Sequence, residues 1–228
     1  STDVDASSTA TYSISGTDAD DFAINSSTGV LTFSSSPNYE SPVDSDGDNV
    51  YEVVVTVTDN TSLTDTQTLT ITVTHVNEAP VITSNLGGTT ASISVNENST
   101  STVTTVTSTD VDASSTATYS ISGTDADDFT IDSSTGVLSF SSSPNYELPT
   151  DSDLDNVYTV IVTVTDNGSL TDTQTIIVTV THVNEAPVIT SNSGGSTTSI
   201  NINENISTVT TVTSTDVDAS STATYSIS

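Results

Sequence analysis

The chain has 228 residues, of which 30 are Asp or Glu and none is Lys or Arg, so its formal net charge at pH 7 is −30. Nucleic-acid phosphates and anionic membrane surfaces are bound through Lys and Arg, and this composition therefore excludes both as partners. The chain also contains no Cys, which excludes disulfides and thiolate metal sites.

An internal repeat sets the domain organisation. A fifteen-residue string begins at Ser1 and returns at Ser108 and Ser214, so the repeat is about 107 residues long. This is the size of one β-sandwich domain. Pro-containing segments at residues 77–80 and 184–187 are natural boundaries between repeats. We therefore expect a repeat without its first strands in residues 1–78, a complete repeat in residues 79–185, and the first strands of a third repeat in residues 186–228.

In the complete repeat, short segments of alternating apolar and polar residues predict seven strands, with a possible helical turn only at residues 125–128. From Tyr158 to Val164 every second residue is apolar, which predicts one buried face and one wet face. The expected strands, in chain order, are residues 81–84 with 92–96, then 102–107, 116–121, 129–132, 137–140, 158–165 and 173–183. This pattern indicates an all-β fold of tandem seven-stranded, Ig-like Greek-key sandwiches.

Acidic residues fall in loops that alternate between the two ends of such an antiparallel sandwich. The side chains expected at one end are Asp110, Asp112 and Asp166, and those at the other end are Glu97, Glu147, Asn184 and Glu185, which face Asp216 and Asp218 of the next repeat. The equivalent positions of the first repeat and its linker are Asp3, Asp5, Glu40, Asp59, Asn77 and Glu78.

These carboxylates have no Lys or Arg to pair with. Two like charges 4 Å apart repel each other by about 1 to 4 kcal/mol, depending on the effective dielectric constant. Clustered carboxylate and amide oxygens select Ca²⁺ over transition metals. Their number also exceeds the number of protein ligands that Mg²⁺ uses, because Mg²⁺ retains several of its waters. The sequence therefore predicts Ca²⁺ at each junction between repeats.

Over its whole length the chain resembles the cadherin repeat in its bacterial tandem form. The matching segments are Asn96-Glu97-Asn98 for the base Glu of that family, Asn145-Tyr146-Glu147 for its Asp-Arg-Glu motif, Asp110-Val111-Asp112 for its Asp-x-Asp motif, Asp166 for the Asp before its last hairpin, residues 129–138 for its central signature, and residues 182–187 for its linker. The resemblance implies a cadherin-like sandwich in which Ca²⁺ ions in each linker rigidify successive domains into an adhesive rod.

The chain departs from that family at Asn145, where a carboxylate is replaced, and at His182, where the family often has Asp. These departures imply fewer or weaker ions per junction. We interpret His75 and His182 as hydrogen-bonding spacers, and Asp125, Asp127, Asp128 and Asp172 as part of a solvated anionic coat. Residues 44–49 and 151–156 resemble the start of an EF-hand loop without its bidentate Glu, which leaves open an auxiliary calcium site or a solvated loop.

The predicted function is that of a calcium-rigidified, extracellular array of structural or adhesive repeats in a bacterial surface adhesin, stalk or filament. The alternative is an adhesin whose Thr-rich faces, such as Thr68, Thr70, Thr72 and Thr74, bind ice, a glycan or a like chain. Enzymatic activity is not expected, because the carboxylates recur identically without Lys, Arg or Cys to complement them. The expected partners are Ca²⁺ and neighbouring repeats or like chains, including exchange of strands between chains. No insertion of this segment into a membrane is expected.

Overall fold

The computed structural model describes residues 9–99, 102–218 and 220–227. It consists of two units, which are described separately below. The first unit comprises Ser1–Glu78 with the loop Asp110–Ser115, and the second comprises Ala79–Thr109 with Thr116–Ser228. The loop Asp110–Ser115 therefore belongs to the first unit, although its neighbours in the sequence belong to the second.

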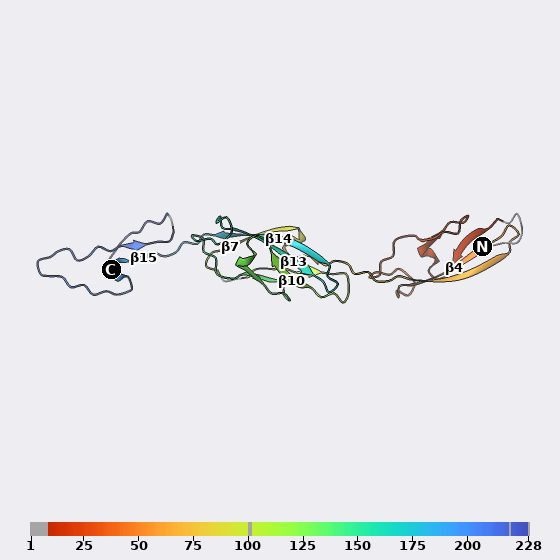
Figure 1. Cartoon of the computed structure of the whole chain (residues 1–228), viewed down its shortest axis with the longest axis horizontal. Coiled ribbons are helices and arrows are strands. Elements are labelled where there is room, and N and C mark those ends of the chain that lie inside the picture. Colours follow the sequence, from red (N-terminus) through yellow and green to blue (C-terminus); the bar gives the residue numbers. More distant parts are fainter. Residues whose placement is uncertain (1–8, 100–101, 219, 228) are drawn as a thin grey trace. The chain divides into compact units, whose positions relative to one another are not determined.

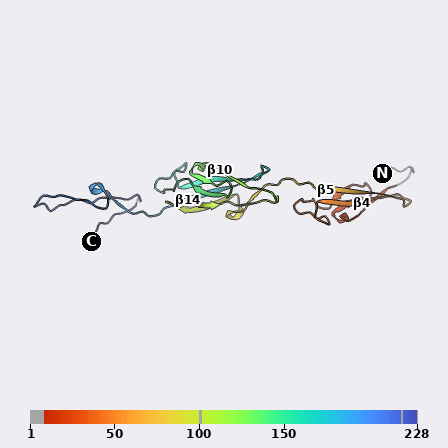
Figure 2. The ribbon, with the colours of Figure 1, turned by 90° about the horizontal axis from the view of Figure 1, so that it is seen from below.

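The first unit contains a three-stranded sheet and a short hairpin. The sheet has the order β1 (Thr11–Ser15), β4 (Val50–Thr58) and β5 (Thr64–Thr72), and the hairpin joins β2 (Phe22–Ile24) to β3 (Leu31–Phe33). All of these pairs are antiparallel. Figure 2 shows β5 beside β4. The buried hydrophobic residues of this unit are Phe22, Tyr51 and Val53.

The second unit contains a complete sandwich. One sheet has the order β10 (Thr118–Ser122), β13 (Val157–Thr165), β14 (Thr171–Thr181) and β7 (Thr90–Asn96), and these strands lie side by side in Figure 1. The other has the order β11 (Phe129–Ile131), β12 (Val137–Phe140) and β8 (Thr102–Thr105). Two short pairs join β6 (Val81–Ile82) to β9 (Ser108–Thr109) and β15 (Val188–Ile189) to β16 (Ser214–Thr215). The all-β sandwich prediction is confirmed.

The core of the second unit lies between its two sheets. Val160 and Ile176 from one sheet and Leu138 from the other are fully buried in a single cluster. In β13 the exposure alternates as predicted, because Tyr158, Val160, Val162 and Val164 are each at most 1% exposed. The helical segments within the described ranges are 3-10 turns of three residues, at Ala19–Asp21, Asn85–Gly87, Ala126–Asp128 and Ser191–Ser193. None of them is long enough to span a bilayer.

Two acidic residues that we interpreted as a solvated coat have structural roles instead. Asp125 is 5% exposed and accepts hydrogen bonds from the backbone N–H groups of Ser152 (2.9 Å) and Thr159 (2.7 Å). Asp172 accepts the backbone N–H of Ile82 at 2.8 Å. The coat interpretation is wrong for Asp125, because a buried carboxylate is retained where backbone donors compensate for its desolvation.

Candidate metal centres

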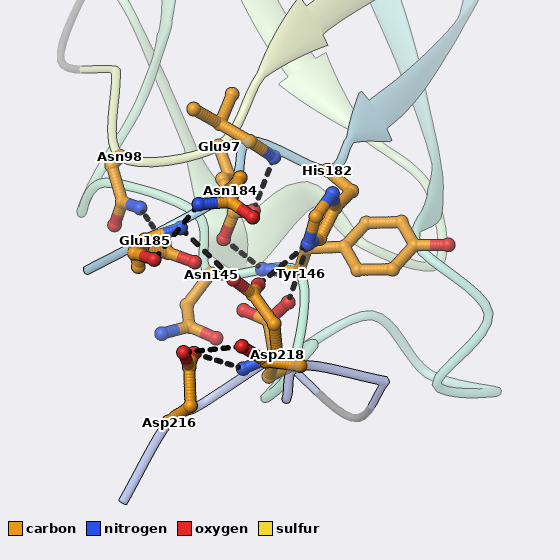
Figure 3. Close-up of polar contacts among 12 residues, drawn as sticks. Glu97, Asn98, Asn145, Tyr146, His182, Asn184, Glu185, Asp216 and Asp218 are labelled. Carbon is orange, nitrogen blue, oxygen red and sulfur yellow. Dashed lines mark hydrogen bonds and ion pairs between the residues drawn. The ribbon is translucent and has the colours of Figure 1, made fainter. Parts of the chain in front are cut away.

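Glu97 is the buried member of a group of carboxylates at one end of the second unit. It directly follows β7 and is 3% exposed. Its Oε1 accepts the backbone N–H of Val183 at 2.7 Å, and its Oε2 accepts the N–H of Tyr146 at 2.9 Å (Figure 3). Glu97 therefore ties the segment after β14 to the loop that carries Glu147.

Three further side chains converge on Glu97. One ligand atom from each of Glu97, Glu147, His182 and Glu185 lies within 4.8 Å of the others. His182 Nε2 is 3.6 Å from Glu147 Oε1. Glu147 Oε2 and Glu185 Oε2 are buried, and neither has a hydrogen-bond partner in the described part of the chain. Buried carboxylate oxygens without donors are costly unless a cation compensates them.

The Asp-Val-Asp loop of residues 216–218 adds a fifth member to this group. Asp218 Oδ1 is 2.6 Å from His182 Nε2, and Asp218 Oδ2 accepts the N–H of Glu185 at 3.0 Å. Asp216 shapes the same loop by accepting the N–H of Asp218 at 3.1 Å and the hydroxyl of Ser221 at 2.6 Å. Asn98 donates its side-chain amide to Glu185 Oε1, as Figure 3 shows.

The electrostatics of this group reflect an excess of negative charge. Partial burial raises the pKa of Glu185, and the charges of Glu97 and Glu147 raise it further, against the hydrogen bond from Asn98. The hydrogen bond to Asp218 raises the pKa of His182, and the same bond lowers the pKa of Asp218. A single imidazole therefore faces several carboxylates, and most of the negative charge of the group is not compensated.

The first unit contains an equivalent group. Glu40, His75, Glu78 and Asp112 each place a ligand atom within 4.8 Å of the others. His75 Nε2 lies 2.6 Å from Asp112 Oδ1 and 3.7 Å from Glu40 Oε1, and Asp112 Oδ2 accepts the N–H of Glu78 at 3.0 Å. Glu40 Oε1 is buried and accepts no hydrogen bond from the described residues. Partial desolvation raises the pKa of Glu78, and the charges of Glu40 and Asp112 add to this effect.

The structure brings most of the carboxylates that the sequence singled out into these two groups. They are Glu40, Glu78 and Asp112 in the first group, and Glu97, Glu147, Glu185 and Asp218 in the second. Asn77 and Asn184 each donate a side-chain amide to the carbonyl of the Glu that follows, and Asp110 accepts the N–H of Asp112.

Other predicted ligands lie outside the two groups. Asp59 caps its own turn, where it accepts the N–H groups of Thr61 and Leu63, and Asp166 accepts the N–H of Leu170, each at 2.8 Å. Neither belongs to the groups of four. Asp3 and Asp5 lie outside the described residues. The roles of all these residues as calcium ligands stay predictions.

Sequence reasoning missed the two histidines as members of these groups. His75 and His182 do form hydrogen bonds, as a spacer would, but their partners are the carboxylates Asp112 and Asp218. The signal that could have found them is their position where cadherin repeats often have Asp. A side chain at that position is expected to face the junction, whatever its type.

The donors of both groups fit a hard divalent cation. Carboxylate oxygens dominate, several of them are buried without a hydrogen-bond donor, and the chain offers no Lys or Arg to neutralise them. Ca²⁺ accepts six to eight oxygen ligands in flexible geometry. The imidazoles are the least suitable donors for this ion, since Ca²⁺ prefers oxygen.

A second kind of acidic group occurs within single loops. Asp44, Asp46 and Asp48 place ligand atoms within 4.8 Å of one another, as do Asp151, Asp153 and Asp155. Asp44 is 6% exposed and accepts the N–H groups of Asp48 (2.8 Å) and Asn49 (3.3 Å). The neighbouring charge of Asp48 raises the pKa of Asp46. These hydrogen bonds give Asp44 a structural role in closing its loop.

The family model of the cadherin domain matches residues 1–74 and 90–181. The chain belongs to the cadherin-domain family. Cadherin domains are extracellular, non-enzymatic adhesion domains that in general bind Ca²⁺, and this chain carries them as tandem repeats. A search of curated proteins found none that matches the chain.

Solved structures of cadherin domains are similar to the chain in fold. Human CDH23 EC21-23 is 22% identical with a TM-score of 0.58, and the match covers 92% of this chain and 74% of that one. Human protocadherin-24 EC1-2 is 22% identical with a TM-score of 0.52, covering 78% and 83%. Mouse cadherin-23 EC22-24 is 24% identical with a TM-score of 0.50, covering 76% of this chain and about half (53%) of that one.

Proposed function

We propose that this cadherin chain is part of a calcium-rigidified, extracellular array of structural or adhesive repeats in a bacterial surface adhesin, stalk or filament. The observation that carries the proposal is the pair of buried, donor-free oxygens of Glu147 and Glu185 beside Glu97 and Asp218. The proposed repeats are residues 1–78, 79–185 and 186–228. The bacterial surface rests on the sequence resemblance to bacterial tandem repeats.

The residues of the second group connect both sides of a linker. Glu97 holds the N–H of Val183 just after β14, and Asp218 holds the N–H of Glu185 two residues later. The carboxylates of Glu97 and Asp218 thus restrain the linker from the preceding and the following repeat. Bound Ca²⁺ would supply the positive charge that lets these carboxylates stay together. Extracellular modules typically bind Ca²⁺ with dissociation constants of about 10⁻⁴ to 10⁻³ M, which suits the medium outside cells.

The Thr-rich face receives less support as a binding surface. The row Thr68, Thr70 and Thr72 in β5 recurs in β14 as Thr175, Ile177 and Thr179. An apolar side chain thus interrupts the hydroxyl row in the second unit. Thr is also an ordinary residue for the solvent side of a strand. We therefore assign the function to the carboxylate groups.

Calcium titration of the full chain tests this proposal. After chelation, we expect added Ca²⁺ to raise the melting temperature and to reduce hydrogen exchange around residues 182–185, because a ligand that binds only the folded state stabilises it. Glu147→Gln combined with Asp218→Asn should move the titration midpoint to higher Ca²⁺ for the second group. Asp127→Asn, which removes one charge from an exposed position, is the control for each of the two substitutions made singly. If Ca²⁺ changes neither readout in the unmodified chain, the carboxylates are only a coat and the proposal fails.

A further inference from the structure

His182 differs in chemistry from the other side chains of its group, because it offers a nitrogen where they offer carboxylate oxygens. Its Nε2 lies 2.6 Å from Asp218 Oδ1 and 3.6 Å from Glu147 Oε1. This nitrogen therefore faces the carboxylates, as Figure 3 shows. Because Ca²⁺ takes oxygen ligands, an imidazole in this place adds nothing to its binding. The position of Nε2 instead suits an ion that accepts nitrogen.

A tyrosine ring orients the imidazole toward the group. The rings of Tyr146 and His182 lie 5.5 Å apart in an edge-to-face arrangement, with an interplanar angle of 75°. The backbone of Tyr146 is itself held on both sides. Its N–H donates to Glu97 Oε2, and its carbonyl accepts the side-chain amide of Asn156, each at 2.9 Å. Neighbours that orient a metal-binding imidazole contribute to metal affinity, which makes Tyr146 a positioning residue.

Three carboxylates beside His182 are available to the same ion. Glu147 Oε2 and Glu185 Oε2 are buried, and neither accepts a hydrogen bond from the described residues. Asp218 Oδ1 has the imidazole as its partner, so an ion between these two atoms would replace that contact. Glu97 is different, because both of its oxygens accept backbone N–H groups. It supports the group from below, while the other three carboxylates supply the ligands.

This donor set matches Zn²⁺. A tetrahedral Zn²⁺ ion takes four ligands and accepts both imidazole nitrogen and carboxylate oxygen at about 2.0–2.2 Å, so two of its ligand atoms lie about 3.3 Å apart. The 3.6 Å from His182 Nε2 to Glu147 Oε1 is close to this spacing. The 2.6 Å from Nε2 to Asp218 Oδ1 has to open by only about 0.7 Å. One imidazole with Glu147, Glu185 and Asp218 completes the four ligands.

The first unit repeats this arrangement. The chain contains two His residues, and both occupy this position in their groups. His75 Nε2 lies 2.6 Å from Asp112 Oδ1 and 3.7 Å from Glu40 Oε1. The ring of Tyr39 lies edge-to-face with His75 at 5.3 Å. The donor types, their spacing and the orienting ring therefore agree between the two units.

We propose that Zn²⁺ binds to each of the two groups through its histidine and competes there with Ca²⁺. The competition rests on the proposed calcium binding, whereas the binding of Zn²⁺ itself does not. Zn²⁺ uses four ligands where Ca²⁺ uses six to eight. An exchange of ions therefore changes how many carboxylates are held around residues 183–185. Zn²⁺ is in this way a regulator of the site that the proposed function assigns to Ca²⁺.

Calorimetric titration of the full chain tests the proposal. The chain is first treated with chelator and then kept in excess Mg²⁺, which fills nonspecific carboxylate positions. Added Zn²⁺ should bind saturably at both groups. His75→Gln leaves the second group to be measured alone. In that background, His182→Gln keeps a hydrogen-bond donor for Asp218 but removes the nitrogen ligand. It should weaken Zn²⁺ binding at least about tenfold and change Ca²⁺ affinity less than about twofold.

The possible outcomes separate this inference from the calcium proposal. Zn²⁺ binding that His182→Gln leaves unchanged would overturn the inference, and so would the absence of saturable Zn²⁺ binding in the unmodified chain. A loss of Ca²⁺ affinity as large as the loss of Zn²⁺ affinity would overturn it too, because the histidine would then not distinguish the ions. If Zn²⁺ binds through histidine but Ca²⁺ binds at neither group, the calcium proposal fails and the Zn²⁺ site stands.

Two further measurements leave the histidines in place. Nitrogen-15 spectra of the full chain contain two imidazoles, and Zn²⁺ should shift the Nε2 resonance of each ring as it binds that atom. An unchanged Nε2 resonance would contradict the inference. Tyr146→Leu removes the orienting ring and should weaken Zn²⁺ binding to the second group, whereas Tyr146→Phe retains the ring and should preserve it. Equal affinities of these two variants would refute the positioning role of Tyr146.

Discussion

The strands β5 and β14 have nearly the same sequence but differ in burial. Residues 64–68 and 171–175 are identical, yet Gln67 is exposed and Gln174 is fully buried. The difference comes from the neighbours, because β7 and the turn at Asn85–Gly87 cover β14. The burial of β14 therefore depends on segments about 80 to 90 residues earlier in the chain and not on its own sequence.

The largest expected effect comes from truncating a core residue of β14. Ile176→Ala should lower the free energy of unfolding of the second unit by about 2–5 kcal/mol, because it leaves a cavity in a fully packed core. Leu69→Ala, at the equivalent position of β5, should cost only about 1 kcal/mol, because that side chain is half-exposed. Urea unfolding of the full chain, resolved by hydrogen exchange, separates the two units. Equal losses would show that β5 is covered in solution.

The buried Gln offers a polar test of the same comparison. Gln174 donates its Nε2 to the carbonyls of Ser84 (3.3 Å) and Gly88 (2.7 Å), and its Oε1 accepts the amide of Asn85 at 2.9 Å. Gln174→Ala should destabilise the second unit by about 1–3 kcal/mol, because it leaves these partners unsatisfied. Gln67→Ala should change stability by no more than about 0.5 kcal/mol. The same unfolding experiment measures both, and a large loss at Gln67 would contradict the exposed edge.

The smallest expected effect concerns the turn after β11. Asp132 accepts the N–H groups of Ser134 (2.9 Å) and Thr135 (2.8 Å), and these bonds lower its pKa. A lowered folded-state pKa contributes stability above the unfolded pKa of about 4, and this is lost as the pH falls through the folded pKa. Asn25 makes the same two bonds in the first unit without titrating. Asp132→Asn should therefore flatten the acid limb of the stability curve of the second unit.

The control for that change is Asp127→Asn, which removes the same charge from an exposed position nearby. This control separates the contribution of the hydrogen bonds in the turn from the general decrease in charge repulsion that the loss of one carboxylate causes in so acidic a chain. The reverse exchange, Asn25→Asp, should steepen the acid limb of the first unit. Melting temperatures between neutral pH and about pH 3 check all three variants, and identical curves for Asp132→Asn and Asp127→Asn would contradict the role of the turn.

The sequence predicted the strands of the complete repeat well, because alternation reports which side of a strand faces a core. It also predicted that Glu97, Glu147 and Glu185 would meet, because short antiparallel connections place alternate loops at one end. It did not predict that Asp125 is buried or that the histidines join the carboxylates. Those facts depend on particular backbone donors, such as the N–H of Thr159, and on distances that loop order does not specify.

The amino-acid sequence alone establishes the repeat length, the strand alternation, the resemblance to the cadherin family, and a formal net charge of −30 with no Lys or Arg to balance it. Which copy of a repeated string is buried, and which carboxylate oxygens lack a hydrogen-bond donor, becomes known from the folded structure. The physical reason is that burial and hydrogen bonding belong to pairs of segments. Identical strings such as residues 64–68 and 171–175 therefore acquire different environments, because among the described residues only the second lies in a strand that is flanked by other strands on both sides.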